Sequence, residues 1–192
     1  RVEAQDATLV GINMEGPFIS EAKKSAQNAA YLHEPDAEMF RRLQKKANGL
    51  FKLCDLAPEI PHAMETIEAL ASEVRLSIAH TEADYETTSE AFRLGARQVT
   101  HLWNAMPPFS HRAPGVIGAA ADNDAVAVEL IADGVHVHPS VVRQTFKMFA
   151  GRVILISDSM MATGLEDGEY SLGGQAVTVR GNLAPLHDGT IA

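Results

Sequence analysis

The feature that most constrains the fold of this chain is a regular alternation of short apolar runs with amphipathic segments. Six runs are predicted as strands, and they cover residues 7–14, 51–56, 74–79, 98–100, 125–131 and 153–156. Four helices are predicted between them, at residues 37–46, 61–73, 84–94 and 140–150. Alternation of this kind is typical of a parallel sheet with right-handed crossovers. The sequence therefore predicts an α/β fold in which all strands end on one face.

The last part of the chain has a different pattern. Residues 169–183 alternate in polarity and contain glycines at the expected turns, which is typical of an antiparallel hairpin. We expect this hairpin to be a small excursion from a single domain that covers residues 1–192.

Composition narrows the classes of partner. With 46% hydrophobic residues the chain can bury a sizeable core, and its net charge of −9 without a basic stripe argues against nucleic-acid binding. The single cysteine, Cys54, excludes an internal disulfide framework and suits a reducing compartment. No apolar run is long enough to span a membrane. We therefore predict a cytoplasmic protein that binds neither nucleic acid nor a membrane, whereas a phosphate ligand stays open.

Ionisable side chains stand at the ends of four predicted strands: Glu15, His80, His101 and Asp158. Strand ends of a parallel sheet emerge on one face, so these residues are expected to converge. Two imidazoles and a carboxylate suit Zn²⁺ first, with Fe²⁺, Co²⁺ or Mn²⁺ as alternatives, and Asp158 is then free to act as a base. Taken singly, Glu15 is better interpreted as a turn carboxylate, and a strand-end histidine is usually a hydrogen-bonded structural residue; the joint placement of the four favours the metal site.

Two further features carry possible chemistry. An H-x-H pair can bind one metal with both rings, but His136 and His138 lie between a glycine and a proline, so we interpret His136 as a substrate contact. Arg112, in the proline-rich loop after Asn104, is predicted to clamp an anion.

Several motifs together resemble one known family. They are M-E-G-P-F at 14–18, A-H-T at 79–81, T-H-L-W-N-A-M at 100–106, I-A-D-G-V-H at 131–136 and S-D-S-M at 157–160. In content and order they resemble the N-acetylglucosamine-6-phosphate deacetylase family of the amidohydrolase superfamily. The resemblance implies metal-dependent removal of acetate from an amino-sugar phosphate.

The resemblance also implies a role for each matched residue. Glu15, His80 and His101 would hold the divalent metal, and Asp158 would be the catalytic aspartate. The substrate contacts would be Asn104, Ala105, Arg112, His136 and Gln27, with Arg112 reaching the site of a neighbouring subunit in a homo-oligomer, expected to be a dimer.

The family fold is a (β/α)₈ barrel of the metal-dependent hydrolase type, and the sequence supplies about six of its eight strands. We therefore expect an incomplete TIM barrel whose open edges are covered by another copy or by additional structure. The alternative function is a catalytically silent domain that at most binds metal or sugar phosphate.

Overall fold

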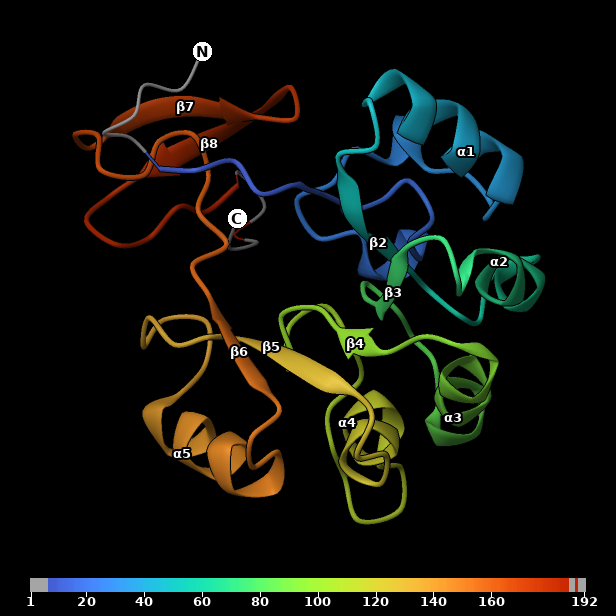
Figure 1. The fold of residues 1–192 in the computed structure, drawn as a ribbon. Helices are drawn as coiled ribbons and strands as arrows, with labels where there is room; N and C mark the ends of the chain where they lie inside the picture. Colours follow the sequence, from blue (N-terminus) through green and yellow to red (C-terminus); the bar gives the residue numbers. More distant parts are fainter. Residues whose placement is uncertain (1–6, 187–188, 190–192) are drawn as a thin grey trace.

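A parallel sheet organises the molecule. The computed structural model describes residues 7–186 and 189, and within them six strands pair in the order β1-β2-β3-β4-β5-β6, all parallel. The strands are β1 (Ile12–Met14), β2 (Phe51–Leu56), β3 (Arg75–Ile78), β4 (Gln98–Val99), β5 (Ala127–Ile131) and β6 (Val153–Ile156). They curl into a half-barrel (Figure 1), as the incomplete-barrel prediction requires.

Helices cover the outer side of the curled sheet (Figure 1). The described residues contain α1 (Ala37–Lys46), α2 (Ala63–Leu70), α3 (Tyr85–Leu94), α4 (Gly115–Ala121), α5 (Pro139–Met148) and the 3-10 turns η1 (Glu21–Lys23) and η2 (Ala29–Tyr31). Asp36 caps α1 by accepting hydrogen bonds from the amides of Glu38 and Met39, at 2.8 and 3.1 Å. Such a cap contributes about 1 kcal/mol, and the predicted bounds of this helix are confirmed.

The helix α4 was not predicted, so the expectation of four helices was wrong. Its sequence, G-V-I-G-A-A-A, has two glycines and no polar face. This composition suits its position, because residues from Gly115 to Ala120 are all buried. A helix that is apolar all round gives no amphipathic period. At Gly118 a Cβ would lie 2.4 Å from the Cβ of Pro114, so glycine permits this close approach.

The first strand is shorter than predicted. We expected residues 7–14, but the ladder with β2 starts where Ile12 pairs with Phe51. Leu9 and Val10 are 62% and 82% exposed. An apolar run becomes a strand only where a neighbour accepts its hydrogen bonds, and none of the strands in the described residues pairs with 7–11.

The core lies between the sheet and its helices. It is made of fully buried strand residues such as Leu56, Ile78 and Val128, packed with Leu70 from α2 and Phe92 from α3. This packing fixes β2, β3 and β4 at the centre of the sheet, and it therefore fixes the loops that follow them.

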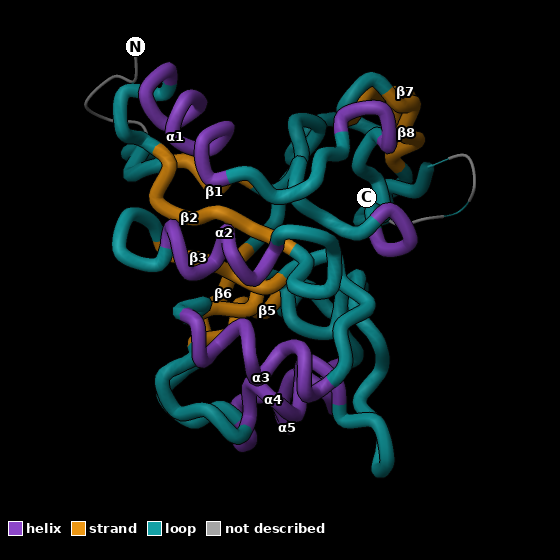
Figure 2. Tube along the Cα trace, turned by 90° about the vertical axis from the view of Figure 1, so that its right-hand side faces the viewer, coloured by secondary structure: helices purple, strands orange, loops and turns teal. Residues whose placement is uncertain are grey.

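The predicted hairpin is confirmed as a separate two-stranded antiparallel sheet, β7 (Gly168–Leu172) with β8 (Gln175–Val179). It lies on the side where most of the long loops gather (Figure 2). The Gln175 side-chain amide donates a hydrogen bond to the carbonyl of Ala26 in the loop after β1. That one domain covers the whole of 1–192 stays a prediction. No helix in the described part of the chain is long and apolar enough to cross a membrane.

Candidate metal and substrate site

Three side chains from separate strand ends meet at one point. Oε1 of Glu15, after β1, lies 2.9 Å from Nε2 of His80 and 3.1 Å from Nε2 of His101, and the two Nε2 atoms are 3.0 Å apart. His80 follows β3 and His101 follows β4. Both rings are buried, at 5% and 3% exposure. Among the described residues this is the one group of three or more such side chains that could hold a metal ion.

The donor set fits a divalent metal. Ligands placed 2.0–2.1 Å from a tetrahedral Zn²⁺ are separated from one another by about 3.3 Å, close to the three separations above. Nδ1 of His80 lies 2.7 Å from the carbonyl oxygen of Lys23, an acceptor, so Nδ1 carries a proton and Nε2 is the ring atom left for a metal. Metal-binding histidines are usually oriented by such a second hydrogen bond. Nδ1 of His101 is buried and has no partner in the described structure.

The electrostatics of the three residues are coupled. Burial alone would raise the pKa of Glu15, but the hydrogen bonds from His101 and His80 outweigh it and hold that pKa well below its usual range. Burial opposes a proton on His101, yet the hydrogen bond and negative charge of Glu15 raise the pKa of that ring. The carboxylate therefore stays ionised and supplies the negative charge that a dication needs.

The backbone at these strand ends is strained. His80, His101, Trp103, Ala105 and Asp158 all have positive φ, at +46°, +33°, +84°, +50° and +50°. Non-glycine residues in this region cost of order 1–3 kcal/mol each, and such strain tends to cluster at functional sites.

A buried polar chain supports the three converging residues. Asp55 on β2 accepts hydrogen bonds from Nδ2 of Asn13 on β1 (3.1 Å) and from Oγ1 of Thr100 (2.9 Å), and Thr100 also bonds Ser77 on β3 at 2.7 Å. Asn13 precedes Glu15 by two residues and Thr100 directly precedes His101. The chain thus ties together the strand ends from which Glu15, His80 and His101 project. Burial, then the negative charge of Glu15, raises the pKa of Asp55 to about 8.

A cavity of about 380 Å³ opens above these residues. Of the nine residues predicted for the site, eight line it: Glu15, Gln27, His80, His101, Asn104, Ala105, His136 and Asp158. Arg112 does not line it. Arg112 is exposed, in the loop between Met106 and α4. The structure therefore gives no support to the prediction that it clamps an anion within this chain's own cavity.

The cavity also has lining residues that sequence reasoning missed. They are Ser25, Ala26, Ile131, Ser159, Met160, Leu172 and Gly173. Leu172 and Gly173 form the turn of the β7–β8 hairpin. The glycine pattern predicted this turn, but nothing in the pattern indicated that the turn would lie over the strand ends.

His136 is held by its own loop. Its Nδ1 lies 2.7 Å from Oδ2 of Asp133, whose other oxygen accepts the amides of Val135 and His136 at 2.9 and 3.0 Å. Burial alone would raise the pKa of Asp133, but these hydrogen bonds lower it by more than burial raises it, so the net shift of the pKa is downward. Nε2 of His136 is therefore the ring atom left for the cavity. His138 is instead the N-cap of α5 and accepts the amide of Ser140 at 3.2 Å.

Asp158 follows β6 and lies on the opposite wall. Desolvation, then the negative charge of Glu15, raises its pKa, whereas His101, His136 and His80 oppose the shift. Its side chain has no hydrogen bond to the described residues, although it lines the cavity, and it is exposed to solvent. Its carboxylate can therefore meet a water or substrate atom in the cavity.

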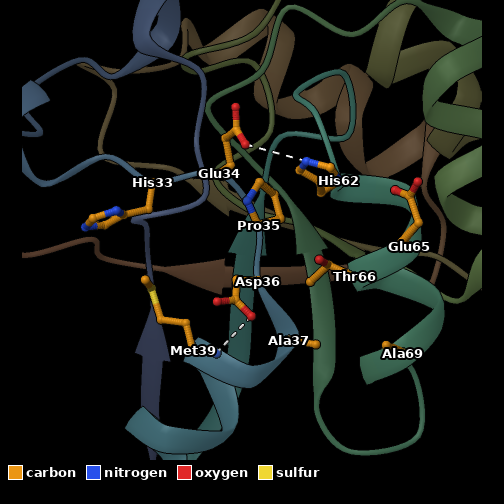
Figure 3. Close-up of a pocket in the computed structure, with 10 residues that line it drawn as sticks. All are labelled: His33, Glu34, Pro35, Asp36, Ala37, Met39, His62, Glu65, Thr66 and Ala69. Carbon is orange, nitrogen blue, oxygen red and sulfur yellow. Dashed lines mark hydrogen bonds and ion pairs between the residues drawn. The ribbon is translucent and has the colours of Figure 1, made fainter.

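A second, more open hollow of about 690 Å³ lies between α1 and α2 (Figure 3). Glu34 faces His62 at 3.7 Å, Asp36 is occupied in capping α1, and His33 points away from both (Figure 3). These groups do not converge, so this hollow is not a metal centre candidate.

Comparison with known proteins agrees with the motifs. The chain is 47% identical over 188 residues to N-acetylglucosamine-6-phosphate deacetylase of Bacillus subtilis, and 37% identical over 186 residues to the Bos taurus enzyme of the same name. The matches cover 97% and 93% of this chain. The chain is homologous to N-acetylglucosamine-6-phosphate deacetylases. It spans about half the length of these curated relatives, 48% and 46%. No family model matches the chain.

Solved deacetylase structures share the fold. A Mycobacterium smegmatis N-acetyl-D-glucosamine-6-phosphate deacetylase variant, in complex with N-acetyl-D-glucosamine-6-phosphate, superposes with a TM-score of 0.92 at 36% identity, covering 95% of this chain and 49% of that one. The Thermotoga maritima deacetylase gives 0.87 at 33% identity, covering 95% and 50%. The incomplete barrel is thus the same architecture as half of these deacetylases.

Proposed function

We propose that this chain carries the metal and substrate site of an N-acetylglucosamine-6-phosphate deacetylase, which hydrolyses the acetamide to acetate and glucosamine 6-phosphate. The observation that carries the proposal is the convergence of Glu15, His80 and His101 on one point beneath a cavity that Asp158 also lines. The homologous deacetylases support the same reaction and substrate.

The metal would be held by Glu15, His80 and His101, with Zn²⁺ as the first candidate and Fe²⁺, Co²⁺ or Mn²⁺ as alternatives. When bound, such an ion lowers the pKa of a water ligand and polarises the amide carbonyl. His80 is already oriented for this role by the Lys23 carbonyl.

Two residues on the other wall would complete the reaction. Asp158 accepts a proton from the attacking water and returns it to the leaving amine, as a general base and then a general acid. His136 keeps Nδ1 on Asp133, which leaves Nε2 to face the developing oxyanion.

The phosphate would be bound by Asn104 and the Ala105 backbone, and Gln27 would be a further substrate contact; all three line the cavity. Arg112, exposed outside it, would reach the phosphate site of a neighbouring copy in a homo-oligomer, expected to be a dimer. A cytoplasmic location completes the proposal.

Acetate release from N-acetylglucosamine 6-phosphate by the Zn²⁺-loaded protein tests the activity. We expect release that depends on the phosphate, with unphosphorylated N-acetylglucosamine turned over far more slowly. An Arg112→Ala variant should raise KM for the phosphorylated sugar, and an unchanged KM would remove Arg112 from the phosphate site.

The alternative is a catalytically silent domain. Its supporting observation is the exposed Asp158, which nothing in the described structure holds in place. Stoichiometric Zn²⁺ binding without acetate release would favour this alternative over the enzyme.

A further inference from the structure

The loop after β4 has one side-chain hydrogen bond that the proposed reaction does not use. Nε1 of Trp103 donates to Oγ1 of Thr145 on α5 at 2.8 Å. Thr145 is fully buried, and its hydroxyl in turn donates to the carbonyl of Val141 at 2.9 Å. The indole thus reaches from a strand-end loop to an acceptor that is itself fixed inside a helix.

Trp103 stands in the middle of the most strained stretch of backbone. His101, Trp103 and Ala105 alternate in positive φ. Between them, Asn104 donates from its backbone amide and its side chain to the carbonyl of His101, at 3.0 and 3.1 Å. A conformation with three such residues persists only when surrounding contacts impose it.

The helix at the other end of this bond follows a loop that contributes His136 to the cavity wall. α5 begins directly after the loop that carries His136, and His138 of that loop caps the helix. The Trp103–Thr145 bond therefore connects the loop that carries His101 and Asn104 with the element that carries His136.

We propose that Trp103 is a positioning residue, and that its hydrogen bond to Thr145 sets the spacing between His101 and Asn104 on one side of the cavity and His136 on the other. The use of this spacing for a sugar phosphate rests on the proposed function. The bond itself and its effect on the position of His101 do not rest on the proposed function.

The chain offers a matched control for the test. Thr88 on α3 is also fully buried, and its hydroxyl donates to the carbonyl of Asp84 four residues earlier at 2.7 Å, as that of Thr145 does to Val141. Thr88→Val therefore removes the same intrahelical hydrogen bond without touching a strand-end loop. Thr145→Ser keeps the hydroxyl that accepts from the indole.

The experiment measures binding of Zn²⁺, and then of glucosamine 6-phosphate to the Zn²⁺-loaded protein, by titration calorimetry. We expect Thr145→Val to weaken sugar-phosphate binding roughly three- to tenfold and Zn²⁺ binding roughly threefold, the size of one lost hydrogen bond. The affinities of Thr145→Ser and Thr88→Val for Zn²⁺ and for the sugar phosphate should stay within twofold of the parent's. Equal binding by parent and Thr145→Val, or equal losses in Thr88→Val, would overturn the proposal.

Failure of the proposed function gives a different result. If the parent binds Zn²⁺ but not the sugar phosphate, the proposed function fails, and the Zn²⁺ affinities of Thr145→Val and Thr88→Val decide the role of Trp103. If the parent does not bind Zn²⁺, both proposals fail.

A double-mutant cycle completes the test. Trp103→Phe removes the donor and keeps an aromatic ring. If the two residues act through their bond, Trp103→Phe with Thr145→Val should bind no more weakly than the weaker single variant. Additive losses would contradict the proposal. Trp103 is the one tryptophan of the sequence, so its emission in the Thr145→Val variant reports directly on this loop.

Discussion

The two sides of the candidate site are built differently. On the side of β1 to β4, Glu15, His80 and His101 contact one another, and a buried chain of hydrogen bonds centred on Asp55 lies next to them. On the side of β6, Asp158 is exposed and has no side-chain hydrogen bond among the described residues. The strand before it is also open, with Leu155 62% exposed.

This difference separates two properties that a metal hydrolase needs. The three proposed metal ligands follow β1, β3 and β4, so we expect metal binding not to depend on β6. The proposed proton transfer should depend on β6, because Asp158 follows this last strand of the parallel sheet. Four substitutions test whether the two sides are independent, beginning with the largest expected effect.

The largest effect is expected from His101→Ala, which removes one of the three proposed metal ligands. Zn²⁺ affinity should fall at least about a hundredfold, and acetate release should be lost. Saturating Zn²⁺ stabilises a protein by about 4 kcal/mol at a thousand times its Kd, so the thermal shift on adding Zn²⁺ should also disappear. His33→Ala, an exposed histidine in the second hollow, is the control. A Zn²⁺ shift that survives in His101→Ala would place the metal elsewhere.

Asp158→Asn should affect only the β6 side of the site, where the proposed proton transfer takes place. We expect acetate release to fall roughly a thousandfold, within the range of general acid–base catalysis, while Zn²⁺ affinity stays within threefold. Asp124→Asn, at a fully exposed carboxylate, is the matched control for loss of one negative charge. A large loss of Zn²⁺ affinity in Asp158→Asn would show that the two sides are not independent.

Asp55→Asn tests the hydrogen-bonded chain beside the metal ligands. Burial raises the pKa of Asp55 from 3.8 to about 8, so between about pH 4 and pH 8 the folded state holds a proton that the unfolded state releases. The free energy of unfolding of the metal-free protein therefore falls as pH rises through this window, by about 1.4 kcal/mol per pH unit.

The asparagine cannot ionise, so that slope should be absent from the variant. From pH 5 to pH 7 the stability of the variant should rise relative to the parent by roughly 3 kcal/mol. Urea unfolding with chelator at the two pH values measures this change. Identical slopes in parent and variant would mean that Asp55 is ionised throughout.

The smallest effect is expected from Asp133→Asn. The amide oxygen can still accept the amides of Val135 and His136, so the loop should keep its conformation. The variant loses the charge that faces Nδ1 of His136. We expect kcat/KM for the phosphorylated substrate to fall roughly three- to tenfold, the size of one charge-assisted hydrogen bond, with Zn²⁺ affinity and melting temperature unchanged. A lowered melting temperature would instead indicate a structural role for Asp133.

Local pattern was sufficient for much of the fold. The alternation of strands and helices predicted the parallel sheet, and the bounds of α1, β2 and β6 agree with the structure. It failed for α4, whose buried apolar sequence has no amphipathic face, and for residues 7–11, which lack a neighbouring strand. In each case the local sequence carries no information about the surrounding packing.

The sequence by itself determined which residues stand at the strand ends, because side chains that follow apolar runs in a parallel sheet must emerge on one face. That rule placed Glu15, His80, His101 and Asp158 together. Tertiary structure decided how they are held: one oxygen of Glu15 shared by two rings, Asp55 bonded across three strands, the hairpin turn over the cavity and the indole of Trp103 on Thr145. These contacts join residues between 42 and 86 positions apart or belong to separate sheets, and only the packing of whole elements can set such distances.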